Sequence, residues 1–243
     1  MIIYGLHTLQ SLVTYHPEWV NVICYDQSLS HTEATHWLET IKTTNQAIQL
    51  QAISKGEFIR QFGSQMRPRV AAKIHMHYQN FSELTDAISK QVDFKGLVLH
   101  NMQDPHNLGA CIRCAAAFGM NAVILTGDRS VKLTPVSHKV ASGGTFLTPI
   151  YKLPDLKKVL QMASQSGLMT IGTSEHANKS IVEMHVDRGW LLVLGEEGCG
   201  LPNFLQDRCE VSTRIPTSPD LSSLNVSVAC GIYLCQLVSG KLT

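Results

Sequence analysis

The sequence lacks the features of membrane, secreted and fibrous proteins. Its 243 residues contain no apolar run of about 18 residues, so we expect no membrane span. The first residues lack the basic start and apolar core of a secretion signal. The seven cysteines are odd in number and scattered, which argues against a disulfide framework and favours the reducing cytoplasm. We expect a cytoplasmic globular protein of one large domain or two modest ones.

The sequence also lacks an excess of charge of either sign, and aromatic residues make up only 7% of it. Its 20 Lys and Arg side chains face 19 Asp and Glu, which leaves a net charge of +1. Proteins that bind RNA through its phosphates usually carry a basic surplus. Here the surplus is local, because five basic residues stand against Glu57 alone between Lys55 and Lys73. Such a stretch indicates either a solvated loop or, beside an active site, a basic arm.

The N-terminal part alternates helical and strand-like patterns. The expected elements are a helix over 6–13, a strand over 19–25, a helix over 33–42, a strand over 47–53 and a helix over 55–62. Residues 63–79 lack clean periodicity and contain Pro68, which indicates a linker. We therefore expect a small α/β domain over residues 1–65, a linker over 66–90 and a second domain over 91–243.

The second domain repeats a strand–helix alternation. The expected strands are 96–100, 122–125, 168–172, 190–194 and 211–215, and the expected helices are 107–119, 135–141, 156–163 and 224–238. Continuously apolar strands between helices favour a parallel sheet that is covered on both faces. The predicted fold class is therefore α/β.

Three segments of this domain share a known pattern. They run from Asn101 to Gly119, from Leu194 to Pro202, and from Ile215-Pro216 through residues 222–229. In this order and spacing they resemble the motifs of the SpoU (TrmH-type) RNA 2′-O-ribose methyltransferases of the SPOUT superfamily. The resemblance is strongest to the bacterial 23S rRNA guanosine-2′-O-methyltransferases. It implies a trefoil-knotted methyltransferase domain, preceded by a ribosomal-protein-like RNA-binding domain.

The resemblance also implies an S-adenosylmethionine cofactor, an RNA substrate, a homodimer and no metal. Its methyl-transfer site would contain Asn107, Arg113, Glu197, Ser223 and Asn225. The cofactor would contact Thr173, Gly195, Gly200, Ile215 and Leu224, and RNA would contact Arg67, Arg69 and Lys73. Within this pattern Glu197 is the matched acid and Glu196 a bystander.

Some of these residues also have simpler interpretations. Asn107 stands where a helix N-cap is expected, and Ser222 or Asn225 could cap the last helix. Arg113 is a lone cation on an apolar helix, so it either reaches water or faces an anion. Because the pKa of a guanidinium is above about 12, Arg113 is a poor general base. Its expected role is to clamp a phosphate beside the ribose, or to hold the geometry while a phosphate oxygen takes the proton.

The glycine-rich turn after residue 194 has one rival interpretation, a dinucleotide fingerprint. The order of its glycines is G-x-x-G-x-G rather than G-x-G-x-x-G, and the acidic residue expected about 20 positions further on is replaced by Ile215-Pro216. Two adjacent carboxylates, Glu196 and Glu197, would also repel a pyrophosphate. They suit a ligand with a cationic sulfonium and ammonium better.

Two departures from the family pattern concern the substrate and the cofactor pocket. Residues 217–221 replace the Met and Gly that relatives usually carry, and Pro219 stiffens this loop. Arg67-Pro68-Arg69 stands where many ribosomal-RNA enzymes have His-Gln-Gly. A tRNA 2′-O-methyltransferase and a non-catalytic RNA-binding or ribosome-assembly protein therefore stay open as alternatives.

The cysteines and histidines give weaker signals. Cys111 and Cys114 form a C-x-x-C inside an Ala-rich helix without a second pair at zinc spacing, which favours core packing. Cys230 and Cys235 on the last helix are also expected to be packing residues. His75 and His77 have no neighbours that complete a metal-ligand set.

Overall fold

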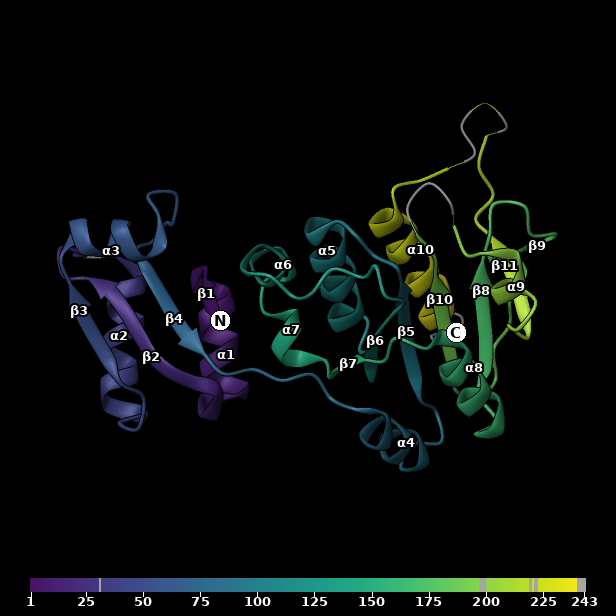
Figure 1. Cartoon of the computed structure of the whole chain (residues 1–243), viewed down its shortest axis with the longest axis horizontal. Helices are drawn as coiled ribbons and strands as arrows, with labels where there is room; N and C mark the ends of the chain where they lie inside the picture. The colour runs from purple at the N-terminus through teal and green to yellow at the C-terminus, as the bar shows by residue number, and fades with distance from the viewer. Residues whose placement is uncertain (31, 197–199, 219, 221–222, 240–243) are drawn as a thin grey trace.

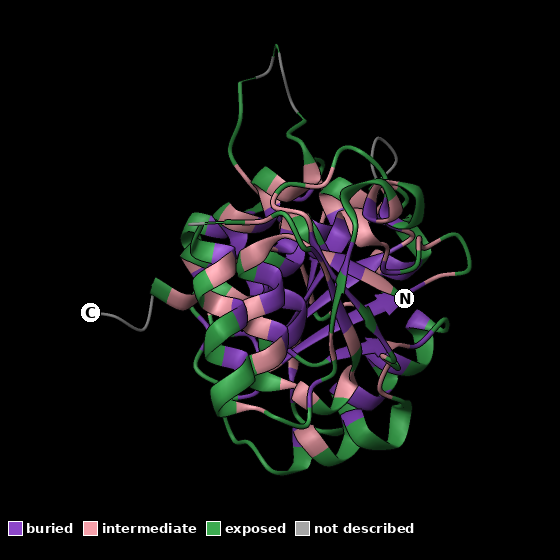
Figure 2. Ribbon diagram, turned by 90° about the vertical axis from the view of Figure 1, so that its left-hand side faces the viewer, coloured by how far each residue is buried: buried purple, intermediate pink, exposed green. Residues whose placement is uncertain are grey.

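Two sheets lie at opposite ends of the molecule, with helices α6 (Pro135–Ala141) and α7 (Gly144–Leu147) between them (Figure 1). The computed structural model describes residues 1–30, 32–196, 200–218, 220 and 223–239. Within these residues, strands make the buried centre of each end, and helices with exposed outer faces surround them (Figure 2).

The N-terminal sheet has the order β1–β4–β2–β3. Its strands are β1 (Ile2–Tyr4), β2 (Val20–Asp26), β3 (Leu50–Ile53) and β4 (Val70–Ile74). Alternate residues of each strand point to opposite faces. One face packs on α1 (Leu6–Tyr15) and α2 (Glu33–Thr44), and the other packs on α3 (Lys55–Phe62).

The expectation of a linker over residues 66–90 is wrong for two segments within it. Strand β4 pairs antiparallel with both β1 and β2, in the middle of the N-terminal sheet. It was missed because a strand buried on both faces shows no alternation, and because Ala71 and Ala72 are too small to give a strong apolar signal. Helix α4 (Phe81–Ser89) follows and begins with a capping box between Asn80 and Glu83.

The C-terminal sheet, within the described residues, has seven parallel strands in the order β7–β6–β5–β10–β8–β11–β9. They are β5 (Lys95–His100), β6 (Ala122–Thr126), β7 (Ile150–Lys152), β8 (Met169–Thr173), β9 (Lys179–Ser180), β10 (Trp190–Leu194) and β11 (Val211–Arg214). The expected parallel α/β sheet is confirmed. The short strands β7 and β9 at its two edges were not predicted, because two or three residues carry no periodic signal.

Both faces of this sheet are covered, as its apolar strands predicted. In β10, Trp190, Leu192 and Leu194 pack with α5 (Pro105–Ala117) and α10 (Val226–Ser239). The alternate residues Leu191 and Val193 pack on the other face with α4, α8 (Leu156–Gln165) and α9 (Asn203–Gln206). This arrangement brings the carboxyl ends of β8, β10 and β11 together at one edge.

The N-terminal and C-terminal parts share a packed boundary. Phe146 of α7 is buried in the same apolar cluster as Leu9 and Leu12 of α1. The hydroxyl of Thr8 donates to the carbonyl of His138 in α6, at 3.4 Å. The ring of His138 stacks on Phe146 with 5.5 Å between the ring centroids. The boundary is therefore a continuation of the N-terminal core and not a solvated joint.

Candidate active site

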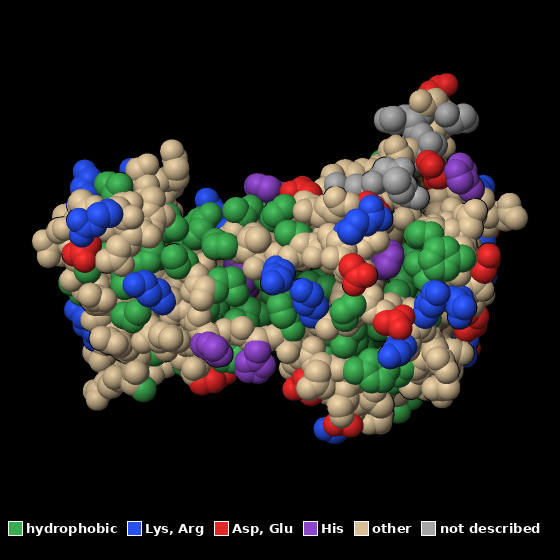
Figure 3. Space-filling model, in the orientation of Figure 1, with side chains coloured by type: hydrophobic (Ala, Val, Ile, Leu, Met, Phe, Trp, Pro, Cys, Tyr) green, Lys and Arg blue, Asp and Glu red, His purple; other side chains and the backbone are tan. Residues whose placement is uncertain are grey.

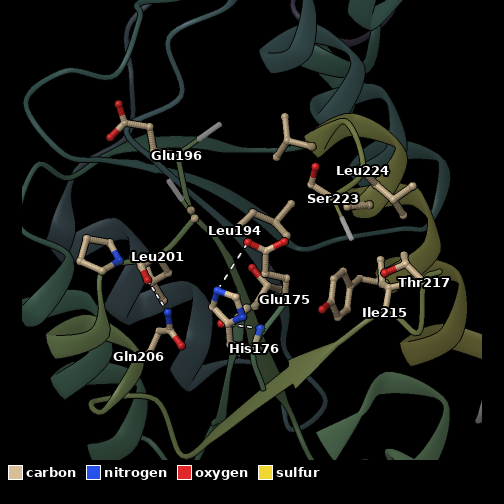
Figure 4. A pocket seen from close by; sticks show the side chains of 18 of the residues that line it. Glu175, His176, Leu194, Glu196, Leu201, Gln206, Ile215, Thr217, Ser223 and Leu224 are labelled. Atoms are coloured by element: carbon tan, nitrogen blue, oxygen red, sulfur yellow. Dashed lines mark hydrogen bonds and ion pairs between the residues drawn. The ribbon is translucent and has the colours of Figure 1, made fainter. Parts of the chain in front are cut away.

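A cavity of about 810 Å³ lies at the carboxyl ends of β8, β10 and β11 (Figure 4). Ligands of open parallel sheets bind outside the carboxyl ends of the strands, because loops and helix N-termini meet there. The residues expected to contact the cofactor all line this cavity: Thr173, Gly195, Gly200, Ile215 and Leu224. Ser223 and Asn225 line it as well. The structure thus brings together parts of two motifs that are more than 10 residues apart in the chain.

In the second motif, Glu196 and Gly200 are joined by two backbone hydrogen bonds at the cavity wall. The amide of Glu196 donates to the carbonyl of Gly200 at 3.0 Å, and the amide of Gly200 donates back at 2.8 Å. A Cβ on Gly195 would lie 2.2 Å from the carbonyl carbon of Gly200, so no side chain fits there. Gly200 has φ +66°, in the left-handed region that favours glycine. Glu197, the acid expected within this motif, lies outside the described residues.

Asn107 and Asn225 connect the first and third motifs. The side-chain amide of Asn225 donates to the Oδ1 of Asn107 at 3.1 Å. The Oδ1 of Asn225 accepts from the backbone amide of Ser227 at 2.9 Å, so Asn225 also caps α10, as its simpler interpretation predicted. The N-cap of α5 is Asp104, which accepts from the amides of His106 and Asn107. The simpler interpretation of Asn107 as the N-cap is therefore wrong, and its side chain contacts the third motif instead.

Arg113 does not line the cavity. It lies on α5, six residues after Asn107, and its side chain is exposed. Among the described residues no carboxylate forms an ion pair with it. An exposed guanidinium without a carboxylate partner is available to an external anion such as a phosphate.

Glu196 is held by two side chains from the loops after β5 and β6. Its Oε2 pairs with Nη2 of Arg129 at 2.6 Å, and its Oε1 accepts from the amide of Gln103. The carboxylate lies at the rim of the cavity, and Figure 4 shows it pointing away from Glu175 and His176. This contact could not be predicted from the sequence, because Gln103 and Arg129 precede Glu196 by 93 and 67 residues.

Several other cavity residues were not predicted. Glu175 and His176 follow β8 and extend into the middle of the cavity, with 3.6 Å between His176 Nε2 and Glu175 Oε1 (Figure 4). Tyr233 of α10 closes the floor and donates to the carbonyl of Thr213 at 2.9 Å, and burial raises its pKa to about 12. For Glu175 and His176 the one signal in the sequence was position, since they follow the predicted strand over residues 168–172 by three and four residues.

The expected RNA-contacting residues differ in their surroundings. Arg69 pairs with the fully buried Asp26 at 3.1 Å. Burial acts to raise the pKa of Asp26, but hydrogen bonds from Ser28 and the contact with Arg69 outweigh it and hold that pKa below its ordinary value. Arg67 binds backbone carbonyls of its own loop, and Lys73 contacts Gln61 at 3.3 Å on an exposed surface. Arg69 is thus part of the N-terminal core, whereas Arg67 and Lys73 remain on the surface.

The surface has no extended basic area on the face that Figure 3 presents, where Lys and Arg are interspersed with Asp and Glu. Within the described ranges, no cluster of three or more His, Cys, Asp or Glu has a metal-binding arrangement. The same ranges contain no helix that is both long and apolar enough to cross a membrane.

Comparison with known proteins assigns the family. The sequence model of the SpoU rRNA Methylase family matches residues 96–235. This range is more than half of the chain and includes all three motifs. The chain belongs to the SpoU rRNA Methylase family. The resemblance seen in the three motifs is thereby confirmed.

Full-length relatives of this SpoU family chain have a consistent name. A 23S rRNA (guanosine-2′-O-)-methyltransferase RlmB from Nitrosomonas europaea is 31% identical over 96% of this chain and 89% of its own length. A protein of the same name from a Burkholderia species is 32% identical, over 99% of this chain and 97% of its own length. The similarity therefore includes the N-terminal part as well as the methylase domain.

Solved structures show the same fold. The SpoU methyltransferase AviRb from Streptomyces viridochromogenes, in complex with the cofactor AdoMet, aligns with a TM-score of 0.85 at 23% identity. The alignment covers 100% of this chain and 91% of AviRb. An AdoMet-bound rRNA methyltransferase from Sinorhizobium meliloti aligns with a TM-score of 0.80 at 19% identity, over 100% of this chain and 87% of that one.

Proposed function

We propose that this protein transfers a methyl group from S-adenosylmethionine to the ribose 2′-hydroxyl of a guanosine in 23S rRNA. The observation that carries the proposal is the cavity at the strand ends, which is lined by the expected cofactor residues of a chain that belongs to the SpoU family. The names of the full-length relatives support guanosine and 23S rRNA as the target. Because rRNA is the substrate, we place the activity in the cytoplasm.

The cavity suits a nucleoside-bearing cofactor in size and lining. Its volume of about 810 Å³ lies within the ordinary range of small-molecule sites. Leu194, Ile215 and Leu224 give it apolar walls for an adenine ring, and the carboxylate of Glu175 lies where a cationic group would be stabilised. When bound there, S-adenosylmethionine supplies a methyl group on a positively charged sulfur atom.

The chain's own groups orient the acceptor and stabilise charge. Asn225, fixed by its bonds to Asn107 and Ser227, holds the first and third motifs in one geometry beside the cavity. The planar guanidinium of Arg113 binds a phosphate next to the target ribose and stabilises the developing alkoxide. Holding the acceptor oxygen in line with the donor is worth several powers of ten in rate.

The last helix supports a homodimer. Leu224 and, on α10, Val228 and Ile232 are between 39% and 51% exposed, and they recur every four residues along one side. A stripe of this kind is apolar surface that one chain leaves uncovered. A second copy of the chain would cover it and would lie beside the cofactor cavity, because Leu224 lines that cavity. Light scattering across micromolar concentrations should give the dimer mass, and a monomer throughout would contradict this part of the proposal.

RNA binding involves the N-terminal part in this proposal. Arg67 and Lys73 are exposed on its surface, where phosphates can contact them. Each phosphate contact adds to the salt dependence of RNA affinity, so alanine at these positions should flatten the dependence of binding on salt. Arg69 contributes indirectly, since it holds Asp26 in the core.

The decisive experiment maps ribose methylation in total RNA from cells with and without this protein. One 2′-O-methylguanosine in 23S rRNA should disappear with the gene and return with the wild-type protein. Loss of a tRNA modification instead would identify a tRNA enzyme. Calorimetry with S-adenosylmethionine tests the cofactor separately, and absence of binding would identify a non-catalytic RNA-binding protein.

A further inference from the structure

Three cysteine thiols meet where α5 packs on α10, outside the cofactor cavity. Cys111 and Cys114 of α5 and Cys230 of α10 pack in one apolar cluster, and the two α5 thiols interact with Cys230. Cys111 and Cys230 are fully buried, whereas Cys114 is partly exposed. The helices are close here, because a Cβ on Gly231 would lie 3.8 Å from the sulfur of Cys114. In the sequence Cys111 and Cys114 form an isolated pair, and in the structure Cys230 joins them as a third thiol.

The surroundings of the three thiols make them chemically different from one another. The contact with Cys230 lowers the pKa of the Cys114 thiol to about 7, against partial burial and with help from the charge of the neighbouring Arg113. The contacts with Cys111 and Cys114, together with burial, raise the pKa of Cys230. Thiolates react with peroxides and thiols do not, so Cys114 is the nucleophile of the group and Cys230 its buried neighbour.

We propose that Cys114 and Cys230 form a dithiol site that hydrogen peroxide oxidises to a disulfide between α5 and α10. The Cys114 sulfur attacks one peroxide oxygen, a sulfur–oxygen bond forms, the oxygen–oxygen bond breaks, and the departing hydroxide takes up a proton. The sulfur of Cys230 then attacks the sulfenic acid, the sulfur–sulfur bond forms, and the departing hydroxide takes the Cys230 proton. Two thiols are oxidised, and one peroxide is reduced to two waters.

The position of this site gives the bond a structural effect. Asn107 precedes Cys114 by seven residues on α5, and Asn225 precedes Cys230 by five residues at the start of α10. The two helices already join through the Asn107–Asn225 hydrogen bond. A disulfide would fasten them a second time, further from the cavity. Because it forms within one chain, it is independent of the proposed homodimer.

The test uses the reduced full-length protein, a few equivalents of hydrogen peroxide, and N-ethylmaleimide to block the remaining thiols. Trypsin cuts after Arg113 and therefore places Cys111 and Cys114 on different peptides. We expect peptide 114–129 to be linked to peptide 215–241, with the protein still at single-chain mass in non-reducing electrophoresis. Linkage through Cys111, or no linkage at all, would overturn the proposal.

Two control variants identify the sulfur atoms that form the disulfide, and neither needs an assay of methyl transfer. The Cys235→Ser variant should retain the link, since Cys235 shares peptide 215–241 but lies on the exposed side of α10. In Cys230→Ser the link should be lost, and dimedone should trap the sulfenic acid at Cys114. In the wild-type protein, where folding is not in question, Cys114 should react at least about tenfold faster than Cys209, whose pKa burial raises to about 12. Equal rates would contradict the proposal whether or not the protein methylates RNA.

Discussion

Asn107 and Asn225 are 118 residues apart in the sequence, and their side chains are joined by a hydrogen bond of 3.1 Å. This bond fixes the start of α10 against α5, at the border of the cavity. Asn225 uses its amide for this contact and its oxygen to cap α10. One side chain thereby sets the orientation of a helix and of the loop with Ser223 and Leu224 before it.

Replacing Asn225 by Ala should lower methyl transfer much more than stability. Loss of the cap costs about 1 kcal/mol of unfolding free energy, whereas misplacement of groups around the reacting atoms lowers the rate roughly 100-fold. Steady-state methylation of an rRNA fragment, together with urea unfolding, measures both. Ser227→Ala is the matched control, because it removes a 2.6 Å bond to the same oxygen and leaves the bond to Asn107. Equal losses in the two variants would assign Asn225 a capping role only.

Arg113→Lys should fold normally and lose most of its methyl transfer. The side chain is exposed, so stability should change by less than about 0.5 kcal/mol. Lysine keeps the positive charge but loses the planar fork that binds a phosphate through two hydrogen bonds. We expect kcat to fall at least about tenfold while the affinity for S-adenosylmethionine is unchanged. Arg188→Lys, at an exposed pair with Glu210, serves as the control. Nearly full activity of Arg113→Lys would contradict the clamp.

Gly195→Ala should abolish cofactor binding. The added Cβ would collide with the backbone at Gly200 and Leu201, so the backbone at the cavity wall has to shift. Calorimetry with S-adenosylmethionine should show an affinity loss of at least about 100-fold, which corresponds to about 3 kcal/mol. Gly56→Ala is the control, because nothing lies within 4 Å of its Cβ position. In that helix alanine should stabilise the protein by up to about 1 kcal/mol and leave cofactor binding intact.

The stability of the protein should fall in mild acid because of His138. Burial lowers the pKa of this imidazole to about 4, from an ordinary 6.5. Between these values the unfolded chain binds a proton that the folded chain does not. The stabilising contribution is therefore fully present above pH 6.5, and about 3 kcal/mol is lost as the pH falls towards 4. Urea unfolding at several pH values should show a weaker dependence for His138→Phe than for wild type over this range. Parallel curves would refute the assignment.

Arg69→Ala should lower the stability of the protein rather than its RNA affinity. Removing this partner leaves the buried carboxylate of Asp26 without its ion pair. Such a loss lowers the unfolding free energy by about 4 kcal/mol. Arg67→Ala, at a surface position, should leave the melting temperature unchanged and lower RNA affinity. Thermal melts with filter-binding titrations separate the two effects. A stable Arg69→Ala protein with weakened RNA binding would restore the role that the sequence suggested.

The sequence was informative where periodicity and motif spacing are strong. The parallel sheet, helices α5 and α10 and the cavity residues Ile215 and Leu224 followed from apolar runs and from the family pattern. Strand β4 did not, because Ala71 and Ala72 are buried by their neighbours rather than by their own hydrophobicity. The trefoil knot stays a prediction, as do the roles of the site residues.

The rest of the site was missed because it depends on contacts between distant segments. The contacts of Glu196 with Gln103 and Arg129 could not be predicted, because both partners come from other loops. Arg69 was taken as part of a basic arm, yet its partner Asp26 lies 43 residues earlier. For Asn107 the sequence allowed a capping role beside its expected place in the methyl-transfer site, and the structure gives the cap to Asp104. In each case the local pattern was compatible with two outcomes, and tertiary packing chose between them.

Phe146 belongs to a helix of the C-terminal part, yet it is buried in the N-terminal core. We therefore expect the two parts of the molecule to keep a constant spacing when they bind RNA. Such an enzyme should modify only a nucleotide at a fixed distance from the RNA element that its N-terminal part binds. Lengthening the RNA stem between the bound element and the target nucleotide should abolish modification without lowering RNA affinity.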